Sequence, residues 1–155
     1  MNSPEIIIFT GPMFGGKTSR LLAAVDRYQY QKRNILCFKP AIDDRYDKGS
    51  IVTHSNSHLT CRVQRVRTGQ DILDAISLGG KPDIIAVDEA FMIPGSARSL
   101  IQLYFEGVTV LVSSLQLSYE GKPFEELQQL LPYATRVEIC PAVCARCDRD
   151  AYYTH

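Results

Sequence analysis

The chain has 155 residues, of which 45% are hydrophobic and 22% charged, and its 17 basic residues balance 17 acidic ones. This length fits one principal domain that can bury a core without disulfide bonds, and the zero net charge argues against nucleic-acid binding by bulk electrostatics. No apolar run approaches the roughly 18 to 20 residues needed to cross a bilayer, which excludes a membrane-spanning helix.

The first third of the chain alternates a predicted strand with a predicted helix. Residues 5–9 form an apolar run rich in β-branched side chains, which predicts a strand buried on both faces. Residues 18–31 repeat apolar side chains at helical spacing and predict a helix, and residues 34–38 predict a second strand. The polar stretch 39–57 predicts a long loop near the active site, with a short strand at 51–53.

The rest of the chain continues this alternation up to a cysteine-rich end. We predict a helix at 69–78, a strand at 83–87, a helix at 94–105 with a proline at its start, a strand at 108–114, a short helix at 124–131 and a strand at 135–140. Apolar strands that alternate with helices are typical of an α/β fold with a mainly parallel sheet flanked by helices. In such folds ligands bind at the carboxyl ends of the strands.

A phosphate-binding motif stands between the first predicted strand and the first predicted helix. Residues 11–18 read Gly-Pro-Met-Phe-Gly-Gly-Lys-Thr and match G-x-x-x-x-G-K-[ST]. In this motif backbone N–H groups converge on phosphate oxygens, the lysine lies near the β- and γ-phosphates, and the threonine hydroxyl ligates Mg²⁺. The alternative is a glycine-rich turn whose lysine faces solvent. The motif predicts that ATP is bound by Gly11, Pro12, Met13, Phe14, Gly15, Gly16, Lys17 and Thr18.

Two adjacent carboxylates, Asp88 and Glu89, follow the apolar strand predicted at 83–87. A phosphate-binding-loop protein needs a strand-end carboxylate to hold magnesium, and Asp88 stands at that place. Because the side chains of neighbouring residues at a strand end point in different directions, Glu89 can have a role different from that of Asp88. Three interpretations of Glu89 stay open: a general base for an acceptor hydroxyl, an activator of water in an ATPase, or a solvated carboxylate.

The cysteines indicate both a compartment and a metal. Five cysteines, an odd number, and a first segment without a signal-peptide pattern predict a reduced, cytoplasmic protein. Cys144 and Cys147 have the spacing of a zinc-binding pair, and a redox role is less expected because the pair does not open a helix. The residues alone allow a local site of Cys140, Cys144, Cys147 and His155, or half of a site with two ligands elsewhere.

Several motifs together resemble the zinc-containing thymidine kinase family of cytosolic and bacterial type. They are GPMFGGKTSRLL, KPAIDDRY, VTH, DIIAVDEA, KPFEEL and AVCARCDRDAYYT, in the family's order and spacing over almost the whole chain. The resemblance implies a P-loop, RecA-like kinase domain at 1–139 and the beginning of a small zinc-binding subdomain at 140–155. It also implies ATP-dependent phosphorylation of the 5′-hydroxyl of thymidine or deoxyuridine, giving dTMP in deoxynucleoside salvage.

The resemblance assigns roles residue by residue. Glu89 corresponds to the general base, Asp88 to the magnesium-associated carboxylate, and Lys17 and Thr18 to the phosphate and metal contacts, while the Asp-x-Arg-Tyr loop reaches the phosphates and the acceptor sugar. The catalytic set implied in this way is Glu89, Arg45 and Lys17. The implied nucleoside contacts are Met13, Asp43, Leu115, Tyr119, Phe124 and Thr154.

The end of the chain carries the remaining implications. In the family this region continues into a loop that closes over the base and into a second pair of zinc ligands, so we expect the sequence to end within that subdomain. Cys144 and Cys147 are then the first half of the zinc site, and a cytoplasmic homotetramer is implied. Two other hypotheses are an ATP-binding regulatory module and a kinase for another nucleoside, which Phe91 and Met92, where the family differs, would permit.

Overall fold

The computed structural model describes residues 3–12, 16–41, 63–143, 146–147 and 149–151. Strands and helices alternate along most of this chain. In order they are β1 Ile6–Gly11, α1 Lys17–Tyr30, β2 Ile35–Pro40, β3 Val63–Val66, α2 Gly69–Gly79, β4 Ile84–Val87, the 3₁₀ turn η1 Ala90–Met92, α3 Ser96–Phe105, β5 Thr109–Leu115, α4 Glu125–Leu130, the 3₁₀ turn η2 Leu131–Tyr133, β6 Arg136–Ile139, β7 Ala142–Val143 and β8 Asp150–Ala151.

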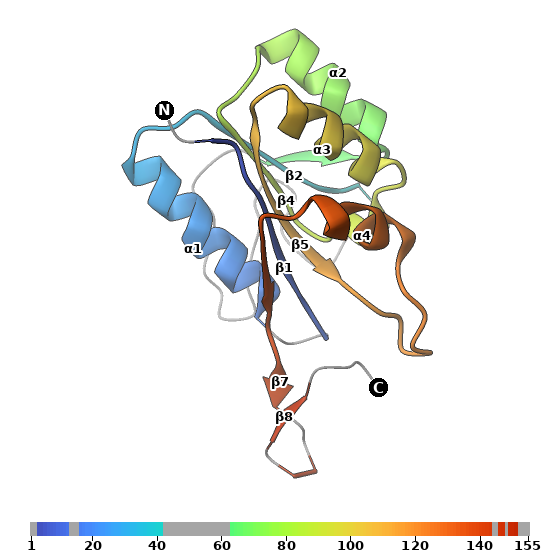
Figure 1. The fold of residues 1–155 in the computed structure, drawn as a ribbon. Coiled ribbons are helices and arrows are strands. Elements are labelled where there is room, and N and C mark those ends of the chain that lie inside the picture. Colours follow the sequence, from blue (N-terminus) through green and yellow to red (C-terminus); the bar gives the residue numbers. More distant parts are fainter. Residues whose placement is uncertain (1–2, 13–15, 42–62, 144–145, 148, 152–155) are drawn as a thin grey trace.

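Six strands form one sheet in the order β3-β2-β4-β5-β1-β6, and every pairing in it is parallel. Parallel strands need crossover connections, so helices cover both faces. Figure 1 shows α1 on one face of the sheet and α2, α3 and α4 on the other. The predicted α/β fold with a mainly parallel sheet is confirmed.

The core lies in two layers, one on each face of the sheet. On one side, α1 packs Leu21 and Val25 against the strands, beside Ile7 and Phe9 of β1. On the other side, α2, α3 and α4 cover a larger cluster that includes Phe38 and draws alternate residues from the same strands. Because β1, β4 and β5 are buried on both faces, their sequences are mostly apolar, and the polar residues Thr10, Ser113 and Ser114 within them are buried as well.

The predicted elements agree with the structure to within a few residues, and three kinds of element were not predicted. The strand β3 reads Val-Gln-Arg-Val, and its two central polar residues leave no apolar run that would predict a strand. The 3₁₀ turns and the β7–β8 pair are too short for a periodic signal. Helix α3 begins at Ser96 and not at Pro94, because Gly95 takes a left-handed conformation with φ 78°. The loop beyond Ala41 and the strand expected at 51–53 lie outside the described residues.

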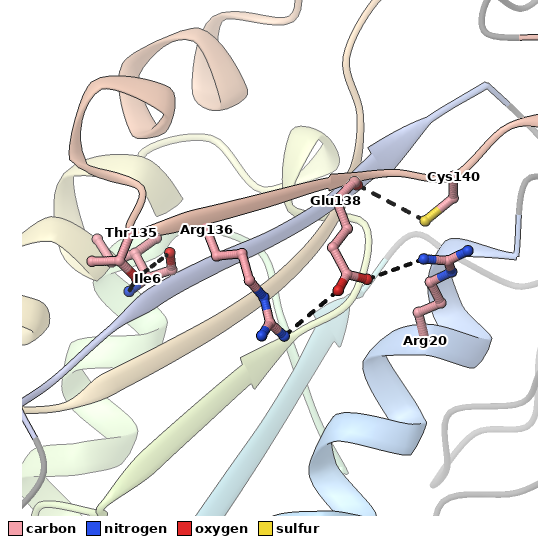
Figure 2. Close-up of polar contacts among 6 residues, drawn as sticks. All are labelled: Ile6, Arg20, Thr135, Arg136, Glu138 and Cys140. Atoms are coloured by element: carbon pink, nitrogen blue, oxygen red, sulfur yellow. Dashed lines mark hydrogen bonds and ion pairs between the residues drawn. The ribbon is translucent and has the colours of Figure 1, made fainter.

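The edge strand β6 is joined to its neighbours by polar side chains. The Thr135 hydroxyl accepts a hydrogen bond from the Ile6 N–H at 3.1 Å and donates to the Ile6 carbonyl at 3.0 Å. Figure 2 shows Glu138 between two guanidinium groups, those of Arg20 at 3.2 Å and Arg136 at 3.6 Å. These contacts fix β6 beside β1 and against the first turns of α1.

An antiparallel pair, β7 and β8, follows β6 and extends beyond the sheet in Figure 1. Within the described part of the chain, no helix is long and apolar enough to cross a membrane.

Candidate functional site

Three loops meet at one edge of the sheet because their strands are neighbours. The order β4-β5-β1 places the carboxyl end of β5 between the other two. The phosphate-binding loop, residues 11–18, follows β1, the Asp88–Glu89 pair follows β4, and Ser113 lies near the end of β5. This edge is where open parallel sheets bind their ligands.

The phosphate-binding loop opens at Gly11, which has φ 136° and lies against the edge strand. A Cβ atom added to Gly11 would lie 2.3 Å from the carbonyl oxygen of Cys140, so only glycine allows this approach. The loop closes at Gly16, the N-cap of α1, whose φ of 77° turns the chain into the helix. Of the predicted ATP contacts, Met13, Phe14 and Gly15 lie outside the described residues.

Lys17, the first residue of α1, reaches across the loop. Its Nζ donates to the carbonyl of Pro12 at 2.6 Å. This contact holds the ammonium group beside the loop at the N-terminus of a helix, where backbone N–H groups and the helix dipole favour a phosphate. The predicted contacts Gly11, Pro12, Gly16 and Lys17 are therefore brought together.

Asp88 lies at the centre of the site and is 1% exposed. Its Oδ1 atom accepts hydrogen bonds from the Thr18 hydroxyl at 3.0 Å and from the Ser113 hydroxyl. Its backbone N–H donates to the Phe38 carbonyl at 3.0 Å, which fixes the residue at the end of β4. A hydroxyl from the phosphate-binding loop and a strand-end carboxylate are thus within reach of one cation, and oxygen ligands are what Mg²⁺ prefers. The two residues predicted to hold magnesium fit that ion.

Glu89 adopts a left-handed backbone conformation, with φ 52° and ψ 51°. This region is uncommon for residues other than glycine, and strain of this kind costs about 1 to 3 kcal/mol. The Glu89 N–H donates to the Ser113 hydroxyl at 3.2 Å, and the carboxylate oxygen Oε2 is buried. Such strain collects at functional sites, which agrees with a chemical role for this side chain.

Sequence reasoning missed three polar residues that share this part of the sheet. Ser113 contacts both carboxylate residues, as described above. Lys39 of β2 is 1% exposed and is paired in register with Arg65 of β3. The register of β2 with β4, together with strand alternation, puts Lys39 on the same face as Asp88 and one strand away. A polar residue within an apolar strand was the available signal for Ser113 and Lys39, whereas β3 has no apolar run in which Arg65 would stand out.

The predicted nucleoside contacts are only partly within the described chain. Leu115 ends β5 opposite Gly11. Phe124 packs against Phe91, which was not among the predicted contacts, with ring centroids 4.6 Å apart and planes at 42°. Tyr119 is 74% exposed, in the turn after β5. The other predicted side chains, Met13, Asp43, Thr154 and the catalytic Arg45, lie outside the described residues.

The cysteines of the proposed zinc site are described only in part. Cys147 is exposed, whereas Cys140 is buried and its thiol lies 3.9 Å from the Glu138 carbonyl. Burial raises the pKa of the Cys140 thiol, which the nearby Arg20 guanidinium lowers in part. Among the described residues no group of three or more potential metal ligands comes together, and Cys144 and His155 lie outside them.

A separate open hollow of about 540 Å³ lies between α1 and β6. Its lining includes Arg20, Arg136 and Glu138, and in Figure 2 both guanidinium groups are engaged by the one carboxylate. This carboxylate offsets only part of the local positive charge, and the described residues that line the hollow include no glycine-rich loop. The phosphate-binding loop and the acidic pair lie elsewhere, at the carboxyl ends of the strands.

Comparison with known proteins agrees with this geometry. The family model described as thymidine kinase matches residues 4–155. A thymidine kinase of Thermococcus kodakarensis is 34% identical over 146 residues, which are 93% of this chain and 74% of the relative. A thymidine kinase of Pyrobaculum aerophilum is 31% identical over 150 residues, which are 96% of this chain and 80% of the relative.

Proposed function

The chain belongs to the thymidine kinase family, and we propose that it phosphorylates the 5′-hydroxyl of thymidine with ATP as donor, at the carboxyl ends of β1, β4 and β5. It is an enzyme of the transferase class, and the product of this reaction is dTMP. The family resemblance supports a role in deoxynucleoside salvage in the cytoplasm.

The single observation that carries the proposal is the contact between Thr18 and Asp88. The Thr18 hydroxyl of the phosphate-binding loop and the Asp88 carboxylate after β4 are 3.0 Å apart, although 70 residues separate them in the sequence. Thr18 and Asp88 would hold Mg²⁺, Asp88 through a water molecule. The bound ion would supply compensation for the charge on the β- and γ-phosphates. Lys17 and the backbone N–H groups of the loop bind and orient the phosphates beside it.

Glu89 is proposed as the general base. It follows Asp88 directly, and its left-handed backbone turns the chain away from the strand direction at the edge of the site. In this role the Glu89 carboxylate accepts the proton of the 5′-hydroxyl as the oxygen bonds to the γ-phosphorus and the bond to ADP breaks. Arg45 is proposed to stabilise the charge on the transferred group.

The nucleoside is proposed to bind beside the aromatic pair Phe91 and Phe124. Phe91 belongs to η1, directly after Glu89, so the rings lie close in sequence to the proposed base. Leu115, Met13, Asp43, Tyr119 and Thr154 are proposed to complete the pocket. Aromatic side chains offer stacking surface for a pyrimidine, and thymidine and deoxyuridine are the acceptors that the resemblance supports.

The cysteines are proposed to bind zinc through Cys144 and Cys147, at the beginning of a small subdomain that spans 140–155 after the kinase domain at 1–139. Zinc content measured on the wild-type 155-residue chain and on Cys147→Ser tests this. One zinc per chain that is lost in the variant supports a local site with Cys140 and His155, and substoichiometric zinc supports a site with ligands supplied from outside these residues. Light scattering tests the homotetramer that the resemblance implies.

The function is tested by incubating the protein with Mg-ATP and a panel of deoxynucleosides, with product analysis by chromatography. We expect dTMP from thymidine and dUMP from deoxyuridine. A product from another nucleoside alone would assign a different acceptor. ATP binding without any monophosphate product would favour a regulatory nucleotide-binding module and reject the kinase function.

A further inference from the structure

We propose that Ser113 is a positioning residue, which holds the Asp88 carboxylate and the Glu89 backbone in one fixed arrangement. The inference rests on the proposed function of these two acidic residues in magnesium binding and proton transfer. Ser113 is not assigned to contact the nucleotide or the nucleoside. It acts through Asp88 and Glu89, which are assigned to magnesium binding and proton transfer.

The Ser113 hydroxyl bonds to both acidic residues at once. It accepts a hydrogen bond from the Glu89 N–H at 3.2 Å and donates one to Asp88 Oδ1. A serine hydroxyl has a single proton to donate, so the bond to Asp88 uses its whole donor capacity. The side chain is 1% exposed, and its donor has no competition from bulk solvent.

The register of the sheet brings Ser113 to this place. Val87 of β4 pairs with Val112 of β5, so the next residues, Asp88 and Ser113, are neighbours across the two strands. Strand alternation puts Ser113 on the face that α1 covers, where Leu111 also lies. Thr18 belongs to α1, and it reaches Asp88 from the same face.

The bond to Asp88 determines how the carboxylate presents itself. Ser113 and Thr18 both donate to Oδ1, so one oxygen is held by two hydroxyls from different elements. Fixing Oδ1 also fixes the direction of the buried second oxygen, Oδ2. Without Ser113 the carboxylate can rotate about its Cβ–Cγ bond and take up a second orientation, which weakens its use as a magnesium-associated group.

The bond to Glu89 supports a backbone that is strained. The left-handed conformation of this residue persists only where its surroundings enforce it, and the Ser113 hydroxyl satisfies the N–H that this turn directs into the protein. Loss of the hydroxyl leaves this partly buried N–H without its acceptor. Because one hydroxyl serves both residues, magnesium binding and phosphoryl transfer should be impaired together.

Ser114 offers a matched control. It is the next residue of β5, it is also fully buried, and its hydroxyl donates to the Leu115 carbonyl at 3.0 Å. Strand alternation puts it on the opposite face of the sheet from Asp88. Ser114→Ala therefore removes the same atom from the same strand at equal burial, on the face of the sheet opposite to the Asp88 carboxylate.

The experiment measures two quantities on wild type, Ser113→Ala, Ser113→Cys, Ser113→Thr and Ser114→Ala. In the first measurement, binding of a non-hydrolysable ATP analogue is followed as Mg²⁺ is added, and the Mg²⁺ concentration at half of the full increase in binding is recorded. The second quantity is the single-turnover rate of thymidine phosphorylation. We expect Ser113→Ala and Ser113→Cys to raise this Mg²⁺ concentration and to lower the single-turnover rate by about 10- to 100-fold each, which is the effect of losing a hydrogen bond to a charged group. Ser113→Thr, which keeps the hydroxyl, and Ser114→Ala should stay within about twofold of wild type in magnesium dependence.

The outcomes separate this inference from the proposed function. Unchanged magnesium dependence in Ser113→Ala, or an equal shift in Ser114→Ala, would overturn the positioning role. If Ser113→Ala does not fold, the contrast between Ser113→Thr and Ser113→Cys decides, and equal values in these two variants would also overturn it. A wild-type protein that binds Mg-ATP but makes no monophosphate would reject the kinase function, while a magnesium shift in Ser113→Ala would still uphold the role at Asp88.

Discussion

The centre of the sheet and its edge strand β6 use polar side chains in opposite ways. At the β4–β5 centre, Asp88 and Ser113 are each 1% exposed, and their hydrogen bonds join three separate elements. At the β6 edge, Glu138 lies between two arginines whose side chains are 51% and 56% exposed. Breaking a buried hydrogen bond at the centre costs more free energy, because the polar group that loses its partner cannot bond to water instead. The exposed ion pairs of Glu138 are screened by solvent, so breaking them costs less. The contrast teaches that the centre holds a buried polar network, whereas β6 is attached by solvent-exposed ion pairs.

The largest effect is expected at the centre, from Glu89→Gln. Removing this proposed base should lower the rate of thymidine phosphorylation by about 10²- to 10⁴-fold, because general base catalysis contributes about that much. Binding of an ATP analogue should be nearly unchanged, since a base acts on the transition state. Steady-state kinetics and equilibrium titration measure the two quantities.

The exposed Glu125→Gln is a matched control for that change, because it removes one carboxylate outside the site. It should leave both quantities at their wild-type values. An equal loss of ATP-analogue binding in Glu89→Gln would assign Glu89 to the metal or to the fold instead of to proton transfer.

The next largest effect is expected at Gly11, which opens the phosphate-binding loop and lies against Cys140 after β6. An added Cβ would meet the Cys140 carbonyl at 2.3 Å, and φ 136° disfavours any side chain. Gly11→Ala should therefore lower the free energy of unfolding by about 2 to 5 kcal/mol. Among the described residues a Cβ at Gly16 meets nothing within 4 Å, so Gly16→Ala should cost only the strain of its φ of 77°, about 1 to 2 kcal/mol. Urea unfolding checks both values, and equal losses would show that crowding by Cys140 is unimportant.

At the β6 edge the expected effect is small. Glu138→Gln breaks the ion pairs with Arg20 and Arg136, and it should lower the free energy of unfolding by less than about 1 kcal/mol. The loss should shrink between about 0.05 M and about 1 M salt, because salt screens exposed charges. Glu120→Gln, which breaks the exposed pair with Lys122, is the control and should have a similar or smaller effect. A loss well above this value would place the edge among the buried contacts and remove the contrast with the centre.

The smallest effect concerns Cys140, the buried residue where β6 ends. Burial raises the pKa of its thiol above the ordinary value of 9.0, so in the folded chain it keeps its proton at a pH where the unfolded chain releases it. This contribution to stability is complete below about pH 9 and is lost as the pH rises through the folded-state pKa. The free energy of unfolding measured from about pH 8 to about pH 10 should therefore fall more steeply in wild type than in Cys140→Ala. Identical slopes would contradict the raised pKa.

Much of the fold could be predicted from the sequence because its signals are local. The apolar runs of β1, β4 and β5 and the helical spacing of α1 identify those elements without any partner, and each was confirmed within a few residues. Strand β3 was not predicted, because an edge strand has only one neighbouring strand and tolerates polar residues such as Gln64 and Arg65.

The candidate site divides in the same way. Thr18 and Asp88 belong to motifs that can be recognised by spacing, and the structure places them in contact. The glycine pattern predicted a phosphate role for Gly11, but its approach to Cys140 depends on β6 lying beside β1. Phe91 was not predicted as the partner of Phe124, because these rings come from η1 and from the residue before α4.

By itself, then, the sequence determined the order of the elements, the phosphate-binding loop and the acidic pair, all of which depend on residues close together in the chain. Only the tertiary structure decided that β5 lies between β4 and β1, and thus that Ser113 bonds to both Asp88 and Glu89. The physical reason is that strand order and register arise from packing between distant segments. A hydroxyl acquires its role from the neighbours that this packing provides.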